Sequence, residues 1–179
     1  MPAALAKEAP ASVNEGIGRR DFARLAEYIH GCAGIKLPPS KKTMVEGRLR
    51  RRLRALNLPS FAAYCAFIFD EGGLEGEAVH LLNALTTNKT DFFREPAHFD
   101  FLARHVLPGA LAGGAREIRA WSAACSTGAE PYTMAMVMEE ALSDAPGVDY
   151  RILATDLSTD VLEVARRGVY PDEMLSPAP

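Results

Sequence analysis

Two acidic residues in the C-terminal half of the sequence lie where an α/β protein could bind a ligand. Glu130 belongs to a polar turn at residues 123–131 that follows an apolar segment, and Asp156 closes a second apolar segment at residues 149–156. In open α/β sheets, ligands bind beyond the carboxyl ends of the strands, where the N–H groups that begin the next helix favour an anion or a carboxylate. An acid at the end of the following strand accepts hydrogen bonds from ribose hydroxyls. Together the two features indicate an adenosine-type ligand.

Both features also have a purely structural interpretation. The turn has a lone Gly128 and is neither a G-x-G-x-x-G sequence nor a P-loop, and Ser/Thr-Gly turns are common connectors. Asp156 or Ser158 could instead cap the helix that follows. Spacing alone leaves these alternatives open.

A third polar segment, residues 87–95, combines a cation with several hydrogen-bonding groups. Asn88, Thr90 and Arg94 flank two phenylalanines there. The planar guanidinium of Arg94 could bind a carboxylate through two parallel hydrogen bonds. The alternative is an ordinary helix start, with Thr90 as the N-cap and Asp91 near the positive end of the helix.

Five arginines are clustered on a predicted helix in the N-terminal part of the chain. Its leucines face the interior, so we expect the arginines to point into solvent and to attract acidic partners, partly by long-range steering. An ordinary solvated helix face is the alternative. Nucleic acid is not expected as a partner, because no DNA- or RNA-binding motif accompanies the cluster and the chain has a net charge of −3. The five residues are Arg48, Arg50, Arg51, Arg52 and Arg54.

The cysteines and histidines form no recognisable constellation. The three cysteines show neither a CxxC motif nor metal-ligand spacing with histidine, so we expect no disulfide framework and no metal, and a reducing compartment such as the cytoplasm fits best. No Ser/His/Asp or Cys/His arrangement can be placed by spacing. No segment approaches the roughly 18 apolar residues of a membrane span, and no signal peptide is visible, so we expect no direct membrane insertion.

Hydrophobic spacing predicts helices in the first half of the chain. Residues 1–18 are rich in Ala, Pro and Gly, a composition typical of a mobile tail. Residues 19–85 contain four short segments of helical period, and we expect Ser40 and Ser60 to be N-caps. Four short helices with short connections predict a small all-α bundle.

The hydrophobic period changes after a junction at residues 86–115. Pro108, Gly109, Gly113 and Gly114 are expected to loosen the chain in that junction. A helix is expected before them, with Phe92, Phe93, Phe99, Phe101, Leu102 and Val106. Residues 116–179 then show the order strand, helix, strand, helix. This order predicts parallel strands and the first part of a doubly wound, Rossmann-like sheet. Because sheets typically have about 4–6 strands, the sequence looks cut off within an α/β domain.

The charges are divided unevenly between the two halves. Residues 1–60 carry 12 Lys and Arg against 5 Asp and Glu, whereas residues 61–179 carry 8 against 18. A division of this kind suggests two parts that meet different partners.

Several unusual strings occur in the second half of the sequence. They are LTTNKTDFFRE at residues 85–95, WSAACSTGAEPY at 121–132, ILATDLS at 152–158 and GVY at 168–170. In these strings and in their order, the chain resembles the CheR family of chemotaxis receptor glutamate O-methyltransferases. The resemblance extends from about Asp21 onward and implies a class I methyltransferase sheet. It also implies S-adenosyl-L-methionine as cofactor, with S-adenosyl-L-homocysteine as product, and glutamates on the cytoplasmic methylation helices of chemotaxis receptors as acceptors.

The resemblance implies a role for each matching residue. In the family, the Asn, Thr and Arg of the first string contact the cofactor, and here they are Asn88, Thr90 and Arg94. Arg94 would pair with the methionyl carboxylate, Glu130 with the ammonium group, and Asp156 with the ribose. The five clustered arginines match the basic second helix that is thought to meet the acidic methylation helices of the receptor.

The chain departs from the family in two respects. The family usually has Glu where Ala129 stands. Its catalytic domain also continues beyond the matching strings, so we expect this stretch of 179 residues to be inactive by itself. One alternative is a non-catalytic module that docks an acidic helical partner through the basic second helix. Another is a methyltransferase of the same fold with a different substrate.

Overall fold

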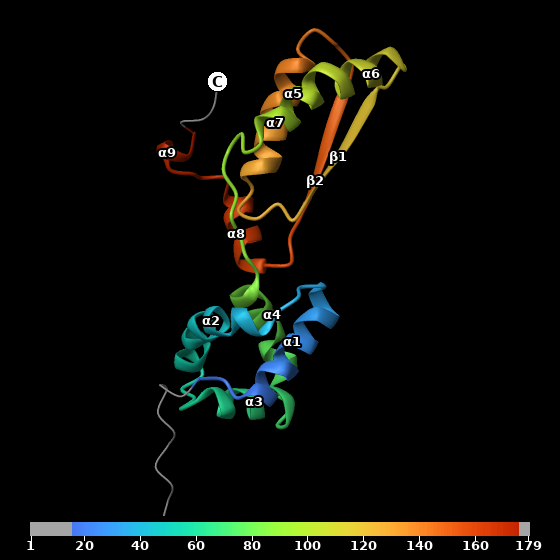
Figure 1. Cartoon of the computed structure of the whole chain (residues 1–179). Helices are drawn as coiled ribbons and strands as arrows, with labels where there is room; N and C mark the ends of the chain where they lie inside the picture. Colours follow the sequence, from blue (N-terminus) through green and yellow to red (C-terminus); the bar gives the residue numbers. More distant parts are fainter. Residues whose placement is uncertain (1–15, 176–179) are drawn as a thin grey trace, which may run out of the picture. The chain divides into compact units, whose positions relative to one another are not determined.

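Figure 1 shows the computed structural model of the chain, which describes residues 16–175. The chain divides into two compact units, Met1–Thr86 and Thr87–Pro179, each with its own hydrophobic core. The first unit is helical, and the second combines helices with a parallel sheet. This architecture confirms the predicted combination of an all-α bundle with an α/β region.

Four α-helices make up the described part of the first unit, and all four were predicted. They are α1 (Arg19–Ala33), α2 (Lys42–Ala55), α3 (Phe61–Phe69) and α4 (Leu74–Leu85), with a short 3₁₀ turn, η1 (Pro39–Lys41), before α2. The helix α3 begins as predicted at Ser60, whose Oγ accepts a hydrogen bond from the Ala63 backbone N–H at 3.1 Å. The helix α1 ends at Gly34, which adopts the left-handed conformation typical of a helix C-terminus.

The prediction that Ser40 caps α2 is wrong. Ser40 lies inside η1, and Lys41 is the residue before α2, without a capping side-chain hydrogen bond. The helical turn starts at Pro39, two residues earlier than an N-cap at Ser40 implies, because proline suits a first helical position, where its missing N–H has no helical partner to lose.

The core of the first unit also includes part of the segment that was predicted to be a mobile tail. Ile17 is 1% exposed, and its N–H donates to Glu46 Oε1 at 2.8 Å. The prediction is therefore wrong for residues 16–18, because one large apolar side chain joins them to the helices. Residues 1–15 lie outside the described part of the chain. The other buried core residues are Phe22, Leu25, Ile29, Leu37, Val45, Leu49, Leu53, Phe61, Tyr64, Cys65, Ile68, Leu81 and Leu85.

The second unit begins with a loop and a composite helix. The helix consists of α5 (Pro96–Phe101), a π-helical turn η2 (Leu102–Val106) and α6 (Leu107–Ala112), without a break between them. The predicted helix is therefore confirmed from Phe99 to Val106 and wrong for Phe92 and Phe93, which precede it. The alternative with Thr90 as N-cap is also wrong, since Glu95 precedes the first helical residue. The expected loosening is wrong for Pro108 and Gly109, which lie within α6, whereas Gly113 and Gly114 form a turn after this helix. The π turn places the Leu107 N–H on the Leu102 carbonyl, and Pro108 then lies in the first turn of α6, where its missing N–H is tolerated.

Two parallel strands and three further helices complete the described residues. They are β1 (Glu117–Ala123), α7 (Ala129–Ala141), β2 (Asp149–Thr155), α8 (Thr159–Arg167) and α9 (Asp172–Leu175). The strands pair in register from Glu117 opposite Asp149 to Ala123 opposite Thr155. The β-α-β-α order and the parallel pairing confirm the sequence prediction, and α8 ends at Gly168, which adopts a left-handed conformation.

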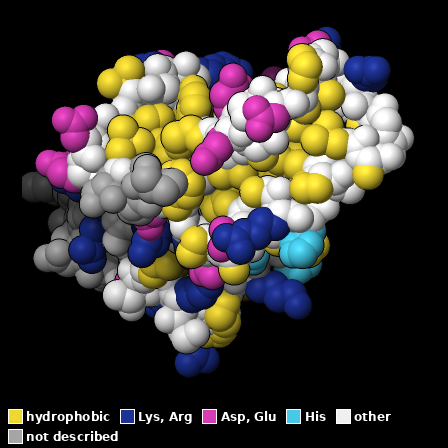
Figure 2. Space-filling view, turned by 90° about the horizontal axis from the view of Figure 1, so that it is seen from above, with side chains coloured by type: hydrophobic (Ala, Val, Ile, Leu, Met, Phe, Trp, Pro, Cys, Tyr) yellow, Lys and Arg dark blue, Asp and Glu magenta, His cyan; other side chains and the backbone are white. Residues whose placement is uncertain are grey.

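The two faces of this sheet differ because side chains alternate along each strand. Ile118 and Ile152 face the helices and pack with Met138 of α7 in the core of the unit. On the opposite face, Trp121 and Leu153 are 66% and 60% exposed. The space-filling view in Figure 2 shows hydrophobic side chains over a broad area of the molecular surface. Trp121 and Leu153 are also register partners, and adjoining exposed apolar side chains are typical of surfaces that contact other protein.

Candidate functional site

The polar turn after β1 has an unusual backbone. Ala124, Ser126 and Gly128 all have positive φ, at 63°, 52° and 97°. A Cβ on Gly128 would lie 2.6 Å from the Tyr170 hydroxyl oxygen and 2.9 Å from the Ala165 Cβ, so a glycine is required for close packing as well as for its φ. Residues in sparsely populated conformations are enriched at functional sites, which singles out this turn.

Asp156 joins the turns that follow the two strands. Its Oδ2 accepts the N–H of Ser126 and its Oδ1 accepts the N–H of Ser158, each at 2.8 Å. The alternative in which Asp156 or Ser158 caps the following helix is thus partly right. Ser158, and not Asp156, occupies the N-cap position of α8. A carboxylate has about four lone-pair sites, so Asp156 keeps the capacity to accept further hydrogen bonds.

Two buried hydroxyl groups belong to the serines whose backbone N–H groups bind Asp156. Ser126 and Ser158 are 5% and 1% exposed, and their Oγ atoms have no hydrogen-bond partner within the described residues. Such unsatisfied groups are rare in native proteins. They mark a region with unused hydrogen-bonding capacity around the carboxyl ends of the strands.

The loop at residues 87–95 is fastened to the sheet-bearing part of the second unit at two neighbouring residues. The Phe92 ring is 3% exposed and packs edge-on against Tyr170, with ring centroids 5.0 Å apart. The Phe93 N–H donates to Thr133 Oγ1 of α7 at 3.2 Å. Tyr170 also donates its hydroxyl to the Thr127 carbonyl at 2.6 Å, which links the loop to the turn after β1.

These attachments bring three of the predicted site residues to one cavity of about 530 Å³. Thr90 and Arg94 come from the loop, and Glu130 comes from the first turn of α7. Glu130 Oε1 accepts the hydroxyl of the buried Ser122 at 2.6 Å, and Arg94 Nη1 donates to the Lys89 carbonyl at 2.9 Å. The cavity is within the 300–1,000 Å³ range of small-molecule sites. Its other lining residues are Lys89, Asp91, Glu95, His98, Phe99, Phe101, Leu102, Val106, Ala124 and Met134.

Side chains of both charge signs line this cavity. Lys89 and Arg94 are cationic, whereas Asp91, Glu95 and Glu130 are anionic. A cavity lined by groups of both signs suits a zwitterion such as an amino-acid moiety, because each ligand charge finds a side chain of opposite sign.

The other two predicted cofactor residues do not line the cavity. Asn88 is half-buried and precedes the first lining residue, and Asp156 lies at the end of β2. Cys125 is buried beside the turn, and burial together with the nearby Asp156 raises the pKa of its thiol. A thiol with a raised pKa is a poor nucleophile at neutral pH, in agreement with the sequence interpretation.

Sequence reasoning missed three residues that support the site. Ser122, Thr133 and Tyr170 hold Glu130, the loop and the turn in place through the contacts above. Ser122 and Tyr170 lie within the strings that carry the family resemblance, and Thr133 directly follows one of them. Their positions in those strings were the available signal, but their partners are too far away in the sequence to be inferred.

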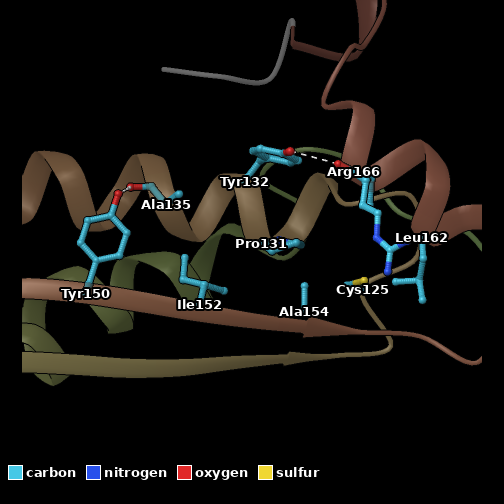
Figure 3. A pocket seen from close by; sticks show the side chains of 10 residues that line it. Cys125, Pro131, Tyr132, Ala135, Tyr150, Ile152, Ala154, Leu162 and Arg166 are labelled. Carbon is cyan, nitrogen blue, oxygen red and sulfur yellow. Dashed lines mark hydrogen bonds between the residues drawn. The ribbon is translucent and has the colours of Figure 1, made fainter.

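A second cavity, of about 400 Å³, lies between α7, α8 and β2 (Figure 3). In Figure 3, Tyr150 and Ile152 project from β2 toward α7, and the Tyr132 hydroxyl donates to the Ala165 carbonyl at 3.0 Å. The lining is mostly apolar and contains no predicted site residue, and Arg166 is its sole charged member. The lining side chains, rather than the volume, therefore distinguish this cavity from the mixed-charge one.

The basic helix α2 divides its arginines between two environments. Arg50, Arg51 and Arg54 are exposed, as expected. The expectation is wrong for the other two. Arg48 donates to the carbonyls of Leu85 and Thr86 at 2.8 and 2.9 Å, where it satisfies the C-terminal end of α4.

Arg52 is bound to an acid that the sequence analysis did not single out. Glu77 of α4 is 3% exposed and accepts two hydrogen bonds from Arg52, each at 2.7 Å. The Tyr64 hydroxyl donates to the same carboxylate at 3.0 Å. Arg52 thus belongs to a buried network that joins α2, α3 and α4.

The described residues contain no group of three or more His, Cys, Asp or Glu side chains that could hold a metal ion. Over the same part of the chain, none of the helices has the length and apolar character needed to cross a membrane.

Comparison with known proteins assigns both units to one family. Residues 20–86 match the family described as "CheR methyltransferase, all-alpha domain", and residues 88–179 match "CheR methyltransferase, SAM binding domain".

Curated relatives are similar over most of the chain. It is 44% identical to the chemotaxis protein methyltransferase of Escherichia coli K12 over 154 residues, which cover 86% of this chain and 51% of the relative. It is 45% identical to chemotaxis protein methyltransferase 2 of Pseudomonas aeruginosa over 163 residues, 90% of this chain and 55% of the relative. For the chemotaxis protein methyltransferase of Borreliella burgdorferi the identity is 37% over 169 residues, 92% and 59% of the two chains. The chain thus spans about half the length of the curated relatives it matches.

Proposed function

The chain belongs to the CheR methyltransferase family, and from this premise we propose that it serves S-adenosylmethionine-dependent methylation of glutamate side chains on chemotaxis receptors. The reaction forms methyl esters and releases S-adenosylhomocysteine. The proposal rests on one observation. Thr90 and Arg94 from one string and Glu130 from another line the same mixed-charge cavity.

The residues present fit the amino-acid half of this cofactor. Arg94 pairs with the carboxylate, since a guanidinium presents five N–H donors and the described contacts use one of them. Glu130 faces the ammonium group, and Ser122 holds that carboxylate from behind. Asn88 and Thr90 add hydrogen-bonding groups on the loop.

Asp156 is proposed to bind the ribose hydroxyls with its remaining lone pairs. Its two contacts to the N–H groups of Ser126 and Ser158 aim the carboxylate and fix the turns on either side.

The residues of this chain act mainly by positioning the methyl donor, and they need to supply little acid–base catalysis. When bound, S-adenosylmethionine supplies an electrophilic methyl group on a sulfonium sulfur, which keeps the bonding electron pair as the glutamate oxygen forms the new bond to carbon. The acceptor carboxylate is ionised at neutral pH, so the proposal needs no general base. The work of Arg94, Glu130 and Asp156 is to hold the donor in line with the acceptor.

Recognition of the receptor is proposed to involve the basic helix α2. The arginines that can meet an acidic helix directly are the exposed Arg50, Arg51 and Arg54. Arg48 and Arg52 act indirectly, because their guanidinium groups bind the end of α4 and Glu77 and thereby fix the orientation of α2.

Cofactor binding is tested by titrating the protein with S-adenosylhomocysteine in a calorimeter. We expect Arg94→Ala to weaken binding about 10- to 100-fold, the effect of one charged hydrogen-bonded contact. Arg116→Ala, which removes an exposed arginine of the same unit, is the matched control and is expected to bind as the native protein does. Absence of binding by the native protein would refute the proposal.

Receptor recognition is tested by charge reversal. The triple variant Arg50→Glu, Arg51→Glu, Arg54→Glu is expected to lose binding to receptor methylation helices while keeping affinity for S-adenosylhomocysteine. The control reverses Arg19, Arg20 and Lys36, which are exposed elsewhere on the first unit. Undiminished receptor binding by the first variant would exclude this role for α2. Receptor binding by a protein that binds no cofactor would favour the non-catalytic docking module.

A further inference from the structure

One buried hydroxyl group connects the two segments that line the mixed-charge cavity. Thr133 of α7 is fully buried, at 0% exposure. Its Oγ1 donates to the Ala129 carbonyl at 2.7 Å and accepts the Phe93 N–H at 3.2 Å. The first bond orients the hydroxyl, so that its lone pair points at the loop.

The loop residue that Thr133 binds has a conformation that needs support. Phe93 has a φ of 52° and Glu95 a φ of 57°, both in the left-handed region that large side chains rarely adopt. Such conformations persist where the surroundings hold them. Arg94 lies between these two residues, so the direction of its guanidinium depends on the loop keeping this shape.

Thr133 also lies on the same helix as Glu130, whose charge is opposite to that of Arg94. Glu130 is three residues before it, in the first turn of α7, and residues three apart are neighbours on a helix surface. The bond from Phe93 to Thr133 therefore sets the position of the Arg94 loop relative to the Glu130 carboxylate.

We propose that Thr133 is a positioning residue for the amino-acid half of the cofactor. It holds Arg94 at the separation from Glu130 that a ligand with both a carboxylate and an ammonium group requires. The inference rests on the proposed function, because it assumes that this cavity takes the methionyl group. Phe92 anchors the loop independently through Tyr170, so loss of the Thr133 bond should misplace Arg94 without releasing the whole loop.

The test uses two substitutions of similar size. Thr133→Val keeps the shape and removes both hydrogen bonds, whereas Thr133→Ser keeps both. Each variant is titrated with S-adenosylhomocysteine and with 5′-methylthioadenosine, which lacks the carboxylate and the ammonium group. We expect Thr133→Val to bind S-adenosylhomocysteine about tenfold more weakly, the effect of one hydrogen bond, and methylthioadenosine nearly as the native protein does. Thr133→Ser should resemble the native protein with both ligands.

A double-mutant cycle with Arg94→Ala gives a second measurement. If Thr133 acts through Arg94, Thr133→Val should cause little further loss of S-adenosylhomocysteine affinity once Arg94 is gone. This cycle decides the matter if methylthioadenosine binds too weakly to measure, and Thr133→Ala replaces the valine variant if that protein does not fold.

Three outcomes would overturn the inference. They are native affinity in Thr133→Val, an equal loss for both ligands, and full additivity with Arg94→Ala. An equal loss would assign Thr133 a general role in folding. Failure of the native protein to bind S-adenosylhomocysteine would instead refute the proposed function, so the two failures are distinguishable.

Discussion

The buried carboxylate of Glu77 provides the sharpest stability prediction for the first unit. Replacing it by glutamine removes the negative charge but keeps an oxygen that can accept the Tyr64 hydroxyl. The charge of Arg52 would then be left in a site where its side chain is 17% exposed. The substitution therefore isolates the ion pair from the rest of the network.

Breaking a buried ion pair by removing one partner costs about 3–5 kcal/mol. We expect about 3 kcal/mol for Glu77→Gln, the lower end, because the partial exposure of Arg52 lets water reach its guanidinium. In a domain of this size, about 1 kcal/mol corresponds to about 4–8 °C in melting temperature. The expected decrease is thus about 12–24 °C for the transition of the helical unit.

Thermal melting followed by circular dichroism measures this decrease, and hydrogen exchange in α2 and α4 assigns the transition to the first unit. Asp70→Asn is the control, because it removes an ion pair with Arg24 that solvent reaches, the two side chains being 55% and 30% exposed, and it should hardly change the melting temperature. The double variant Glu77→Leu, Arg52→Met should be more stable than Glu77→Gln, since it leaves no buried charge unpaired. A melting temperature of Glu77→Gln equal to the native value would refute this account of the network.

Three further predictions concern local features. Ser60→Ala removes the N-cap of α3 and should cost about 0.5–2 kcal/mol of unfolding free energy in denaturant titrations, whereas an unchanged midpoint would show that the cap contributes nothing. Gly128→Ala should impair both stability and S-adenosylhomocysteine binding, because its Cβ would meet Tyr170 and Ala165; normal calorimetric titration would contradict this. Burial raises the pKa of Cys65 from 9.0 to about 12, so the folded state keeps a proton that the unfolded state releases. The resulting stabilisation is complete below pH 9 and is lost as the pH rises toward 12. Over that pH range, the unfolding free energy of Cys65→Ala should therefore fall less steeply than that of the native protein. Parallel curves of unfolding free energy against pH for the two proteins would argue against a buried thiol.

Much of the fold was predictable because its signals are local. Helical spacing of apolar residues located α1 to α4, and apolar segments next to polar turns indicated both strands. Ser60 marked the start of α3 through the hydrogen-bonding preference of a single residue. The strings at residues 85–95 and 121–132, which carried the family resemblance, are likewise local signals that need no knowledge of distant contacts.

The errors have a common physical origin. Phe92 has the spacing of a helical residue, but its ring is needed against Tyr170, 78 positions later, and the chain before Pro96 therefore stays non-helical. Ile17 lies in a segment of tail-like composition, yet Glu46 and the bundle core bind it. In each case a contact with a distant residue outweighs the local preference.

The sequence by itself determined the order of helices and strands and the residue types available at the site, because period, capping and turn chemistry depend on neighbours in the chain. The tertiary structure decided which side chains are used together. It assigned Arg52 to Glu77, brought Arg94 and Glu130 to one cavity, and placed Thr133 between their segments. These pairings follow from the packing of elements that are remote in sequence, where burial and hydrogen-bond satisfaction select one partner from many that the sequence allows.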